Sequence, residues 1–339
     1  LYYPPHLEFV VLGTRERRAV VDQLSRLLLE KEVRTLIFQG DNMTIALAIL
    51  EACKKAGCRG ILHYHGSPYA YLRKYIYAQD ISDNPINILK LLLSKVVYPF
   101  KKRKLRKVLD RAKDGLVCVS EGTAKELRTI FRLTEKQGKN ILSIHNPLTF
   151  DVPETLRADW SQKENALVYV SRLERKHKNS MLVARSWARI AHEYPDWTLW
   201  ILGDGSVRSK MEDYLAKNKV TNVAFYGLVS NVEDYLERSS ISLLGSDCEG
   251  LPVGMMESAS YANALISTKS DGGIIDIIED GVSGYLVPRN SSNRLSEKLE
   301  ELITDFSKRQ ELALNARSKM QMFTDELIMD KWEQLLKSL

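Results

Sequence analysis

Two glutamates in the second half of the sequence, Glu249 and Glu257, have the type and spacing expected of residues that hold two parts of one polar ligand. The run GLPVGMM between them is typical of a tight turn followed by the first turn of a helix. The free N–H groups of Gly250, Leu251 and Val253 would then point, with the positive end of the helix dipole, at a diphosphate or a sugar hydroxyl. The plainer alternative is that Glu257 is a solvated helix residue, but its apolar neighbours favour a buried carboxylate with a polar partner.

Two cations, Arg172 and Lys178, follow the apolar run ALVYVS and precede a helical pattern. Cations between a strand end and a helix start are well placed for two phosphate groups, which an arginine fork and a lysine ammonium both bind. They would also stabilise the charge of a departing nucleoside diphosphate. We interpret the charged residues between them, Arg175, Lys176 and His177, as surface charge.

Other predicted strand ends carry glycine or polar residues. Gly203 lies in the run LGDG, Val229 and Asn231 lie in GLVSN, and two glycines stand at 272–273. Each signal is weak alone, because such turns are common. Since the carboxyl ends of parallel strands meet at one edge of a sheet, these strand ends and the charged ones above together predict one ligand site there.

The elements that must position these residues alternate between short apolar runs and longer helical patterns. Such runs are typical of parallel strands that crossover helices bury on both faces. We predict strands in TLIFQG, GILHYHG, GLVCVS and ILSIHNP, and then in ALVYVSR, TLWILGD, VAFYG, ISLLGS, ALIST and GYLVP. The sequence therefore predicts an α/β protein with two Rossmann-like, doubly wound domains that face each other across a cleft.

The domain boundaries follow from where this alternation pauses. We place an acceptor-side domain at 1–150, a polar linker at 151–164, a ligand-binding domain at 165–324, and a terminal helix at 325–339 that could pack back on the first domain. The first convincing strand–helix–strand unit begins near Arg34, so we expect the first domain to lack its initial βα unit.

The composition is that of an ordinary globular protein. The 339 residues are 44% apolar and 27% charged, and the net charge is only +6, which does not favour a nucleic-acid binder. The start LYYPPHLEFV has no signal-peptide pattern, and no apolar stretch approaches the roughly 20 residues of a membrane span. The four cysteines lack metal-ligand spacing, so we expect reduced thiols and a cytoplasmic protein.

The order of the motifs resembles that of the C-terminal domain of retaining glycosyltransferases of family 4 (group 1), which have the GT-B fold. The matching run is Arg172-Leu with Lys178-Asn, then LGDG, YGLV, two glutamates with seven residues between them, and DGVSGYLV. It covers nearly the whole second domain. Ser171, Ser258 and Asn263 depart from the family's usual residues, but none of the four principal charged residues does.

The resemblance implies a role for each matching residue. By it, Arg172 and Lys178 bind the donor diphosphate, Glu249 contacts the hydroxyls of the transferred sugar, Glu257 contacts the ribose, and the loop 229–231 contacts the base. The donor-binding set is then Arg172, Lys178, Glu257, Gly250, Leu251, Val253, Gly203, Val229 and Asn231.

A histidine beside the transferred sugar is also implied by the resemblance. His65, next to Gly66, is the better match, and with Glu249 it forms the expected catalytic pair. His63 shares its face if the strand persists, and one of the two could be a structural histidine. We expect Ser120 to cap the helix that follows it.

A basic segment at 90–113 carries ten Lys or Arg and one acid, together with several large apolar residues. It resembles the amphipathic helix with which such enzymes meet a membrane, and each basic residue near an anionic leaflet is worth about 1 kcal/mol. The alternative is a solvated basic helix. We expect Pro99 to interrupt or kink this helix.

Together, these features and the resemblance predict a metal-independent hexosyltransferase; retention of configuration is implied by the resemblance and not by any nucleophile in the sequence. The donor would be a UDP- or GDP-sugar, with no cofactor, and the acceptor a glycan or lipid-linked glycan of cell-surface polysaccharide synthesis, at the inner face of the membrane. No Asp-x-Asp metal motif is present, so Arg172 and Lys178 would neutralise the leaving group. A nucleotide-sugar-binding protein without transferase activity, or a GT-B sugar epimerase, remains the alternative.

Overall fold

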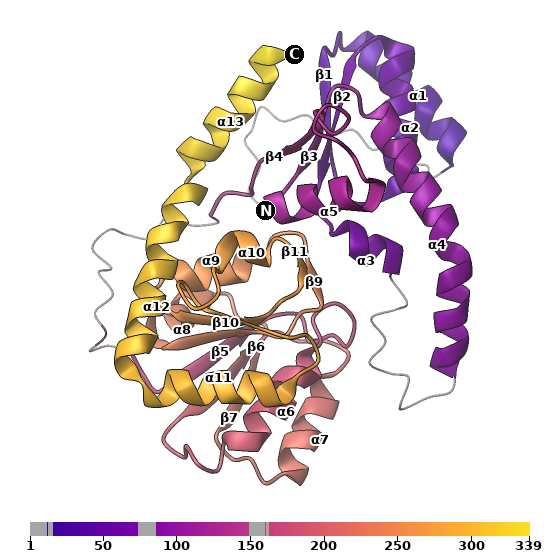
Figure 1. The fold of residues 1–339 in the computed structure, drawn as a ribbon. Coiled ribbons are helices and arrows are strands. Elements are labelled where there is room, and N and C mark those ends of the chain that lie inside the picture. The colour runs from indigo at the N-terminus through magenta and orange to yellow at the C-terminus, as the bar shows by residue number, and fades with distance from the viewer. Residues whose placement is uncertain (1–11, 13–15, 74–85, 149–159, 161–162) are drawn as a thin grey trace.

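The computed structural model describes residues 12, 16–73, 86–148, 160 and 163–339, with the side chains of 86–91 excepted. Two parallel sheets with helices on their faces stand one above the other, and the chain passes from the first to the second after residue 148 (Figure 1). The predicted linker at 151–164 lies almost wholly outside the described residues, as does the chain before Arg17 except for Leu12 and Glu16.

The first sheet has four described strands in the order β1-β2-β3-β4, all parallel. Its strands are β1 (Thr35–Gln39), β2 (Arg59–Tyr64), β3 (Leu116–Cys118) and β4 (Ile141–Ser143), and its helices are α1 (Arg17–Glu30), α2 (Met43–Ala56), α3 (Pro68–Arg73), α4 (Ile86–Arg111) and α5 (Glu121–Phe131). The side chain of Asn42 caps the start of α2, and Gly57, at φ 71°, ends the helix in the left-handed region.

The second sheet has six parallel strands in the order β12-β10-β8-β5-β6-β7. They are β5 (Ala166–Val170), β6 (Thr198–Leu202), β7 (Val223–Gly227), β8 (Ile241–Leu244), β10 (Ala264–Thr268) and β12 (Tyr285–Val287). Strand order reverses between β5 and β8, which are hydrogen-bonded neighbours. The crevice beyond the carboxyl ends of these two strands is therefore the topological switch point, where ligands of doubly wound domains bind.

Helices cover both faces of the second sheet, and Tyr169 and Trp187 are fully buried between them. The helices are α6 (Ser180–Ile190), α7 (Arg208–Lys217), α8 (Val232–Arg238), α9 (Val253–Ser260), α10 (Ile274–Ile277), α11 (Ser292–Thr304) and α12 (Phe306–Lys319). A short parallel pair, β9 (Cys248–Glu249) and β11 (Asp271–Gly272), stands apart from the main sheet and faces the first domain (Figure 1).

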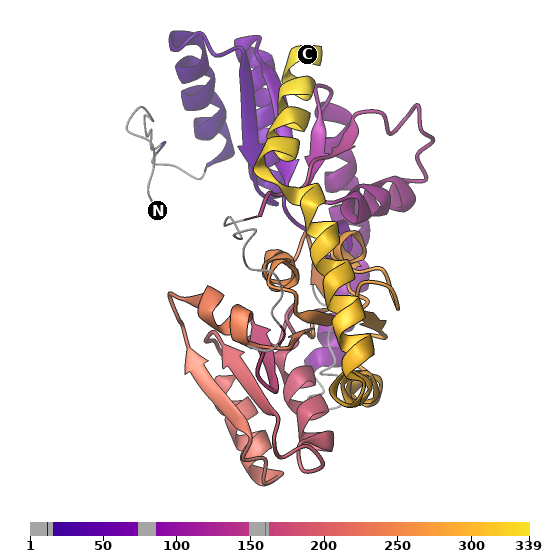
Figure 2. The same cartoon turned by 90° about the vertical axis from the view of Figure 1, so that its left-hand side faces the viewer.

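The last helix, α13 (Asp325–Ser338), returns to the first sheet after the 3-10 turn Met320–Phe323. It runs from beside the second sheet up to the first, as the two views agree (Figures 1 and 2). Ile328 is buried against Ile61, Val117 and Ile144, and Trp332 packs on the same cluster. The end of the chain thus forms part of the core of the first sheet.

Two differences from the sequence-based expectations concern helices. Helix α4 continues through Pro99, so the expected interruption is wrong; Pro99 lies on an exposed face of α4. Helix α1 was not predicted, although Val21, Leu24, Ser25 and Leu28 are buried at the spacing of one helical face.

Candidate functional site

Two cavities meet at the switch point. The first, called here the central cleft, has a volume of about 450 Å³ and lies between the domains, with Gly66 and Ser67 on one side and Arg172, Lys178 and Glu249 on the other. The second, called here the side pocket, has about 280 Å³ and is lined by residues of the second domain alone, among them Lys178, Glu249, Leu251 and Val253. Lys178 and Glu249 belong to both cavities and mark their junction.

The Lys178–Glu249 pair is held in place by its surroundings. Nζ of Lys178 donates to Oε1 of Glu249 at 2.8 Å, and the hydroxyl of Ser246 donates to the same oxygen at 2.5 Å. The side chains are 22% and 10% exposed, so neither charge is fully solvated. A buried carboxylate that accepts two hydrogen bonds is oriented as well as neutralised.

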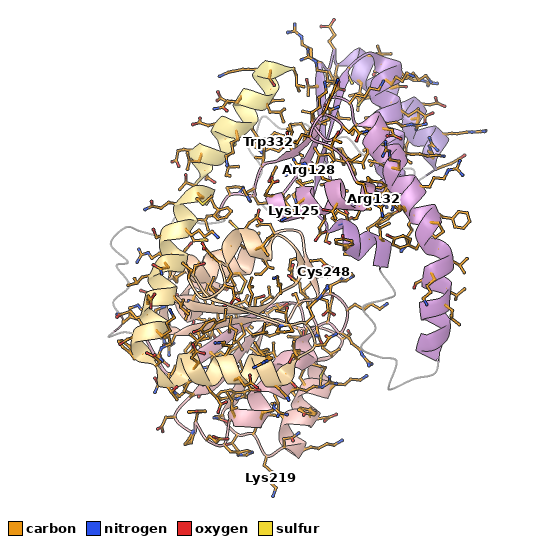
Figure 3. The ribbon with its side chains drawn as sticks, in the orientation of Figure 1. Lys125, Arg128, Arg132, Lys219, Cys248 and Trp332 are labelled. Carbon is orange, nitrogen blue, oxygen red and sulfur yellow. The ribbon has the colours of Figure 1, made fainter. Side chains whose placement is uncertain are left out.

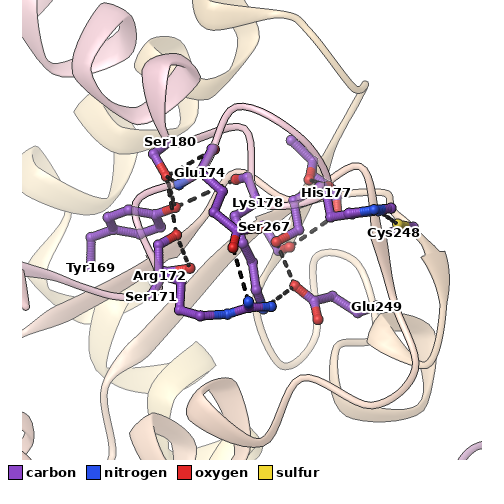
Figure 4. A network of polar contacts seen from close by, with 12 residues as sticks. Tyr169, Ser171, Arg172, Glu174, His177, Lys178, Ser180, Cys248, Glu249 and Ser267 are labelled. Carbon is purple, nitrogen blue, oxygen red and sulfur yellow. Dashed lines mark hydrogen bonds and ion pairs between the residues drawn. The ribbon is translucent and has the colours of Figure 1, made fainter. Parts of the chain in front are cut away.

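The loop between β5 and α6 carries Lys178 and is fixed by a local polar network (Figure 4). The hydroxyl of Ser180 lies 2.9 Å from that of Tyr169 and accepts the backbone N–H of Glu174 at 3.1 Å. His177 and Asn179 both have positive φ, 62° and 45°, on either side of Lys178. Such strained backbone persists only where its surroundings hold it in place.

The interpretation of His177 as surface charge is wrong. His177 lines the central cleft, and its Nδ1 lies 2.9 Å from Sγ of Cys248, the residue before Glu249 (Figure 4). The contact joins the loop of Lys178 to strand β9, because Cys248 is itself buried. Burial also raises the pKa of the Cys248 thiol, which keeps it in the neutral form that can share this hydrogen bond.

Arg172 also lines the central cleft, but its side chain is 72% exposed. Nη1 of Arg172 lies 2.9 Å from Oε1 of Glu174. An exposed pair of this kind is weak, so the guanidinium is able to turn to another anion that enters the cleft.

The start of α9 closes the side pocket. Leu251, Pro252, Val253 and Gly254 line it, and within the described chain the N–H groups of Gly250, Leu251 and Val253 donate to no other group. Pro252 stands just before the first helical residue. Leu251 and Val253 line the side pocket and Gly250 lines the central cleft, beside the helix start where free N–H groups and the helix dipole favour an anion.

Four of the predicted donor-binding residues lie outside the lining of these two cavities. Glu257 is half-buried one turn into α9, with Oε2 about 4.0 Å from where a Cβ on Gly254 would stand. Gly203, at φ 125°, lies so close to the carbonyl of Ser171 that a Cβ there would stand 2.0 Å from its oxygen. Val229 packs in the cluster around Trp200 and Leu202, and Asn231 donates to Asp234 at 2.6 Å.

In the first domain, His63 and His65 do lie on one face of β2 and its extension. Nε2 of His65 is 3.2 Å from Nδ1 of His63, and the His63 ring meets Trp332 of α13 edge-on at 5.0 Å between centroids. Burial, with a smaller contribution from His65, lowers the pKa of His63 to about 4. Burial lowers the pKa of His65 as well, and Asp41 opposes this.

His65 reaches the second domain through its backbone. A Cβ on Gly250 would stand 2.0 Å from the carbonyl oxygen of His65, so only glycine permits this approach. His65 is not among the residues that line the central cleft or the side pocket, whereas its neighbour Gly66 is. The backbone of His65 therefore lies against the turn that follows Glu249.

The start of α5 is bound to the second domain. Asp276 of α10 accepts the backbone N–H groups of Glu121 at 2.6 Å and Gly122 at 3.0 Å, and it lies 2.7 Å from Nε2 of His145. Ser120 caps α5 through the N–H of Thr123, as predicted, and its hydroxyl also lies 2.8 Å from the carbonyl oxygen of Gly250. A carboxylate at a helix N-terminus is favoured by the free N–H groups and the dipole there.

Glu126, on the next turn of α5, adds a further contact between the domains. One carboxylate oxygen accepts the hydroxyl of Ser67 at 2.8 Å, and the other accepts the N–H of Gly272. Burial raises the pKa of Glu126 to about 7, although the bond from Ser67 opposes the rise. Asp276 and Glu126 were missed in the sequence analysis. Both look like solvent-exposed acidic residues of a helix, and only the position of the other domain shows their contacts.

Two further searches concern only the described part of the chain. There, no three His, Cys, Asp or Glu side chains form a group that could hold a metal ion. Nor does any described helix have both the length and the apolar character needed to cross a membrane.

Comparison with known proteins finds a matching family, curated relatives and solved structures of similar fold. Residues 154–319 match the family of glycosyl transferases group 1. The chain carries a group 1 glycosyltransferase domain. The match includes the loop of Lys178, the turn after Glu249 and all of α9.

Two curated relatives extend the match toward the first domain. An alpha-1,4-N-acetyl-D-galactosaminyltransferase of Campylobacter jejuni, named for an acceptor that ends in PP-undecaprenol, is 29% identical over 203 residues, which is 60% of this chain and 56% of the relative. The amylovoran biosynthesis glycosyltransferase AmsD of Erwinia amylovora is 26% identical over 69% of this chain and 65% of its own. The chain thus matches somewhat more than half the length of each.

Solved structures establish the fold. Sucrose-phosphate synthase from Thermosynechococcus elongatus superposes with a TM-score of 0.74 at 17% identity, over 95% of this chain and 77% of its own. Anabaena HepE, solved in complex with UDP, superposes with a TM-score of 0.71 at 15% identity, over 94% of this chain and 82% of its own. The chain has the GT-B fold, and the predicted fold class is confirmed.

Proposed function

We propose that the protein is a retaining hexosyltransferase that uses a nucleoside-diphosphate sugar. One observation carries the proposal: the Lys178–Glu249 pair stands where a pocket of the second domain meets the cleft between the domains. A ligand that spans this junction has one part in each cavity and its charged centre at the pair. A nucleotide sugar, with a diphosphate between its two ends, has that shape.

The donor is assigned to the second domain. Lys178 and the more mobile guanidinium of Arg172 would bind the diphosphate, and the N–H groups of Gly250, Leu251 and Val253 would bind its oxygens or the sugar hydroxyls. Glu249 would orient the sugar and Glu257 the ribose. Gly203, Val229 and Asn231 belong to the neighbouring strand ends and would approach the nucleoside, for which Asn231 must leave Asp234.

The reaction requires that the protein position the donor and the acceptor and stabilise the negative charge of the leaving diphosphate. The acceptor hydroxyl enters from the first domain, and the bond between the anomeric carbon and the diphosphate breaks as the new glycosidic bond forms on the same face. The departing diphosphate takes the bonding electrons and receives the acceptor's proton. Lys178 and Arg172 stabilise the charge that develops on it, so we propose that no metal ion is needed. His65 is assigned to the sugar because its backbone adjoins the turn after Glu249.

We further propose that the acceptor is a glycan or lipid-linked glycan of cell-surface polysaccharide synthesis, since both relatives above act in glycan assembly by name. The exposed side chains of helix α4 support binding of the protein to a membrane surface. Leu92, Leu93, Val96 and Phe100 are all more than half exposed on it, and basic residues follow from Lys101 onward. The protein would then act in the cytoplasm, at the inner face of the membrane.

A screen of nucleotide sugars for thermal stabilisation tests the donor, because a ligand that binds only the folded state raises the midpoint of unfolding. The sugar that stabilises the protein is then incubated with candidate acceptors, and release of nucleoside diphosphate is measured. Release that depends on acceptor supports transfer. Binding without release under any condition would favour a nucleotide-sugar-binding protein, and equal donor affinity in Glu257→Ala, Arg172→Ala and wild type would overturn the site.

A further inference from the structure

A third cavity lies between the domains, on the far side of α3 from the central cleft. This interface cavity has a volume of about 380 Å³ and is lined by Tyr69 of α3, by one face of α5, by the segment 269–272 and by Arg289. Tyr71, two residues after Tyr69, lines the central cleft instead. The first turn of α3 therefore separates the two spaces, and the interface cavity is distinct from the donor site.

The charges that line the interface cavity favour an anion. Lys125 on α5, Lys269 and Arg289 contribute three cations from both domains (Figure 3 labels Lys125 where α5 faces the second domain). Neither Lys125 nor Lys269 forms an ion pair with any residue that the structure describes. Arg289 pairs with Asp271 at 2.8 Å and leaves the other two charges uncompensated.

The second carboxylate in the cavity, Glu126, does not cancel this excess. Burial raises its pKa to about 7, so this carboxyl carries less negative charge at neutral pH than an exposed glutamate does. The lining then holds three positive charges against one full and one partial negative charge. A cavity with net positive charge attracts an anionic group, and lysine and arginine are the side chains that bind phosphate.

A buried hydroxyl in the same cavity also lacks a partner. Ser270 is 6% exposed, lines the cavity, and its Oγ has no hydrogen-bond partner among the described residues. A buried polar atom without a partner costs free energy that a bound ligand could recover. Because Ser270 directly follows Lys269 in the sequence, its hydroxyl offers a hydrogen-bond donor near that cation.

One hydrogen bond connects this cavity to the central cleft. Ser67 lines the cleft and donates to Glu126, which lines the interface cavity, at 2.8 Å. The linings of the two spaces therefore touch, so one elongated molecule that occupied both would have a hydroxyl in the cleft and another of its groups in the cavity. Arg172 and Lys178, the cations assigned to the donor, line the central cleft and not the interface cavity.

We propose that the interface cavity binds a phosphate or diphosphate group of the acceptor. The inference rests on the proposed function, since it assumes that the acceptor hydroxyl is used in the central cleft. Both domains contribute cations, so the bound group would also hold them together around the reaction. The acceptor class is thus an anionic one, either a lipid diphosphate or a phosphate-bearing glycan.

Binding of inorganic pyrophosphate tests the cavity, measured by calorimetry with UDP in excess to occupy the donor site. The double variant Lys125→Gln/Lys269→Gln should bind pyrophosphate about tenfold more weakly than wild type or worse, because two charge-assisted contacts are lost. The matched control is Lys136→Gln/Lys139→Gln, which removes the same charge from exposed lysines after α5 and should bind as wild type does. Equal affinity in the two double variants would overturn the proposal.

A second arm identifies the source of the anionic group. Geranyl diphosphate that binds wild type more tightly than pyrophosphate, and loses that affinity in Lys125→Gln/Lys269→Gln, indicates a lipid diphosphate. Equal binding of the two probes indicates that the phosphate group alone is recognised, as on a glycan. Binding of UDP and of GDP is measured on every protein: absence of both from wild type would refute the donor site, whereas the comparison of the two double variants still decides the cavity.

Discussion

Nζ of Lys178 lies 2.8 Å from Oε1 of Glu249, and the two residues come from loops on either side of the point where strand order reverses in the second sheet. A hydrogen bond therefore joins residues 71 positions apart in the sequence at the topological switch point of the second sheet. The hydroxyl of Ser246 donates a second hydrogen bond to the Glu249 carboxylate. The pair is thus a structural feature before any donor binds.

This pair should show measurable coupling in a double-mutant cycle. Removing Lys178 alone leaves a nearly buried carboxylate without its cation. Lys178→Ala should therefore lower the free energy of unfolding more in the wild-type protein than in the Glu249→Ala variant. We expect a coupling free energy of about 1–3 kcal/mol from urea unfolding of the two single variants and the double variant. The control is the exposed pair Lys337–Glu333, with side chains 77% and 60% exposed, for which about 0.5 kcal/mol or less is expected. Equal coupling in the two cycles would contradict the assignment.

Asp276 should protect the start of α5. In Asp276→Ala the backbone N–H groups of Glu121 and Gly122 lose their acceptor, and His145 loses its carboxylate partner. We expect faster amide hydrogen exchange in the peptide that contains Glu121 and Gly122, with a loss of about 1 kcal/mol in stability from the missing cap. Asp213→Ala, an exposed change on α7, serves as the control. Unchanged exchange in Asp276→Ala would mean that the contact does not hold the domains together.

The fold was largely predictable because each strand is a short apolar run bounded by polar turns. Strands β7 and β10 have the bounds that the sequence indicates. The course of α4 through Pro99 was not predictable from local rules, because the cost of a proline depends on what its face meets, and here that is solvent.

The candidate site was predictable only in part. Arg172, Lys178 and Glu249 follow strands of one sheet, so their order along the chain already implies that they meet. His177 and Cys248 also meet, but nothing in either run indicates the other. The contacts of Glu126 and Asp276 join residues more than 130 positions apart and depend on how one domain sits on the other. Local sequence carries no signal for such contacts.

Helix α4 should bind anionic membranes through its exposed apolar side chains and its basic residues. Liposomes that contain anionic lipid should sediment the wild-type protein, less so as salt rises, because the electrostatic part of the attraction is screened. Leu92→Ser/Val96→Ser/Phe100→Ser should reduce the bound fraction severalfold without loss of folding, since all three side chains are exposed. The control is Leu327→Ser/Met329→Ser, which changes exposed apolar residues of α13. Binding that is insensitive to salt, or equal loss in both variants, would argue against the proposal.

Glu126 should make the protein less stable as pH rises from 5 to 8. Its pKa is raised by burial from 4.5 to about 7 in the folded protein, so the unfolded chain loses its proton first. The stabilisation is therefore complete below about pH 4.5 and is lost as pH rises through about 7, by something of the order of 2 kcal/mol. Glu126→Gln, which cannot ionise, should lose less stability over this range in urea unfolding than wild type. The exposed control Glu326→Gln should keep the wild-type slope, and equal slopes in all three proteins would contradict the prediction.

Trp332 should control the titration of His63. The His63 ring meets that of Trp332 edge-on, and burial is the main reason that its pKa falls to about 4. In Trp332→Ala, water reaches the ring, and the pKa should rise by about 1 or more toward the ordinary value near 6.5, followed by NMR of the ring protons. Trp332→Phe keeps an aromatic cover and should titrate close to wild type. If His63 has the same pKa in Trp332→Ala as in Trp332→Phe, its burial comes from the first sheet alone and α13 does not shield it.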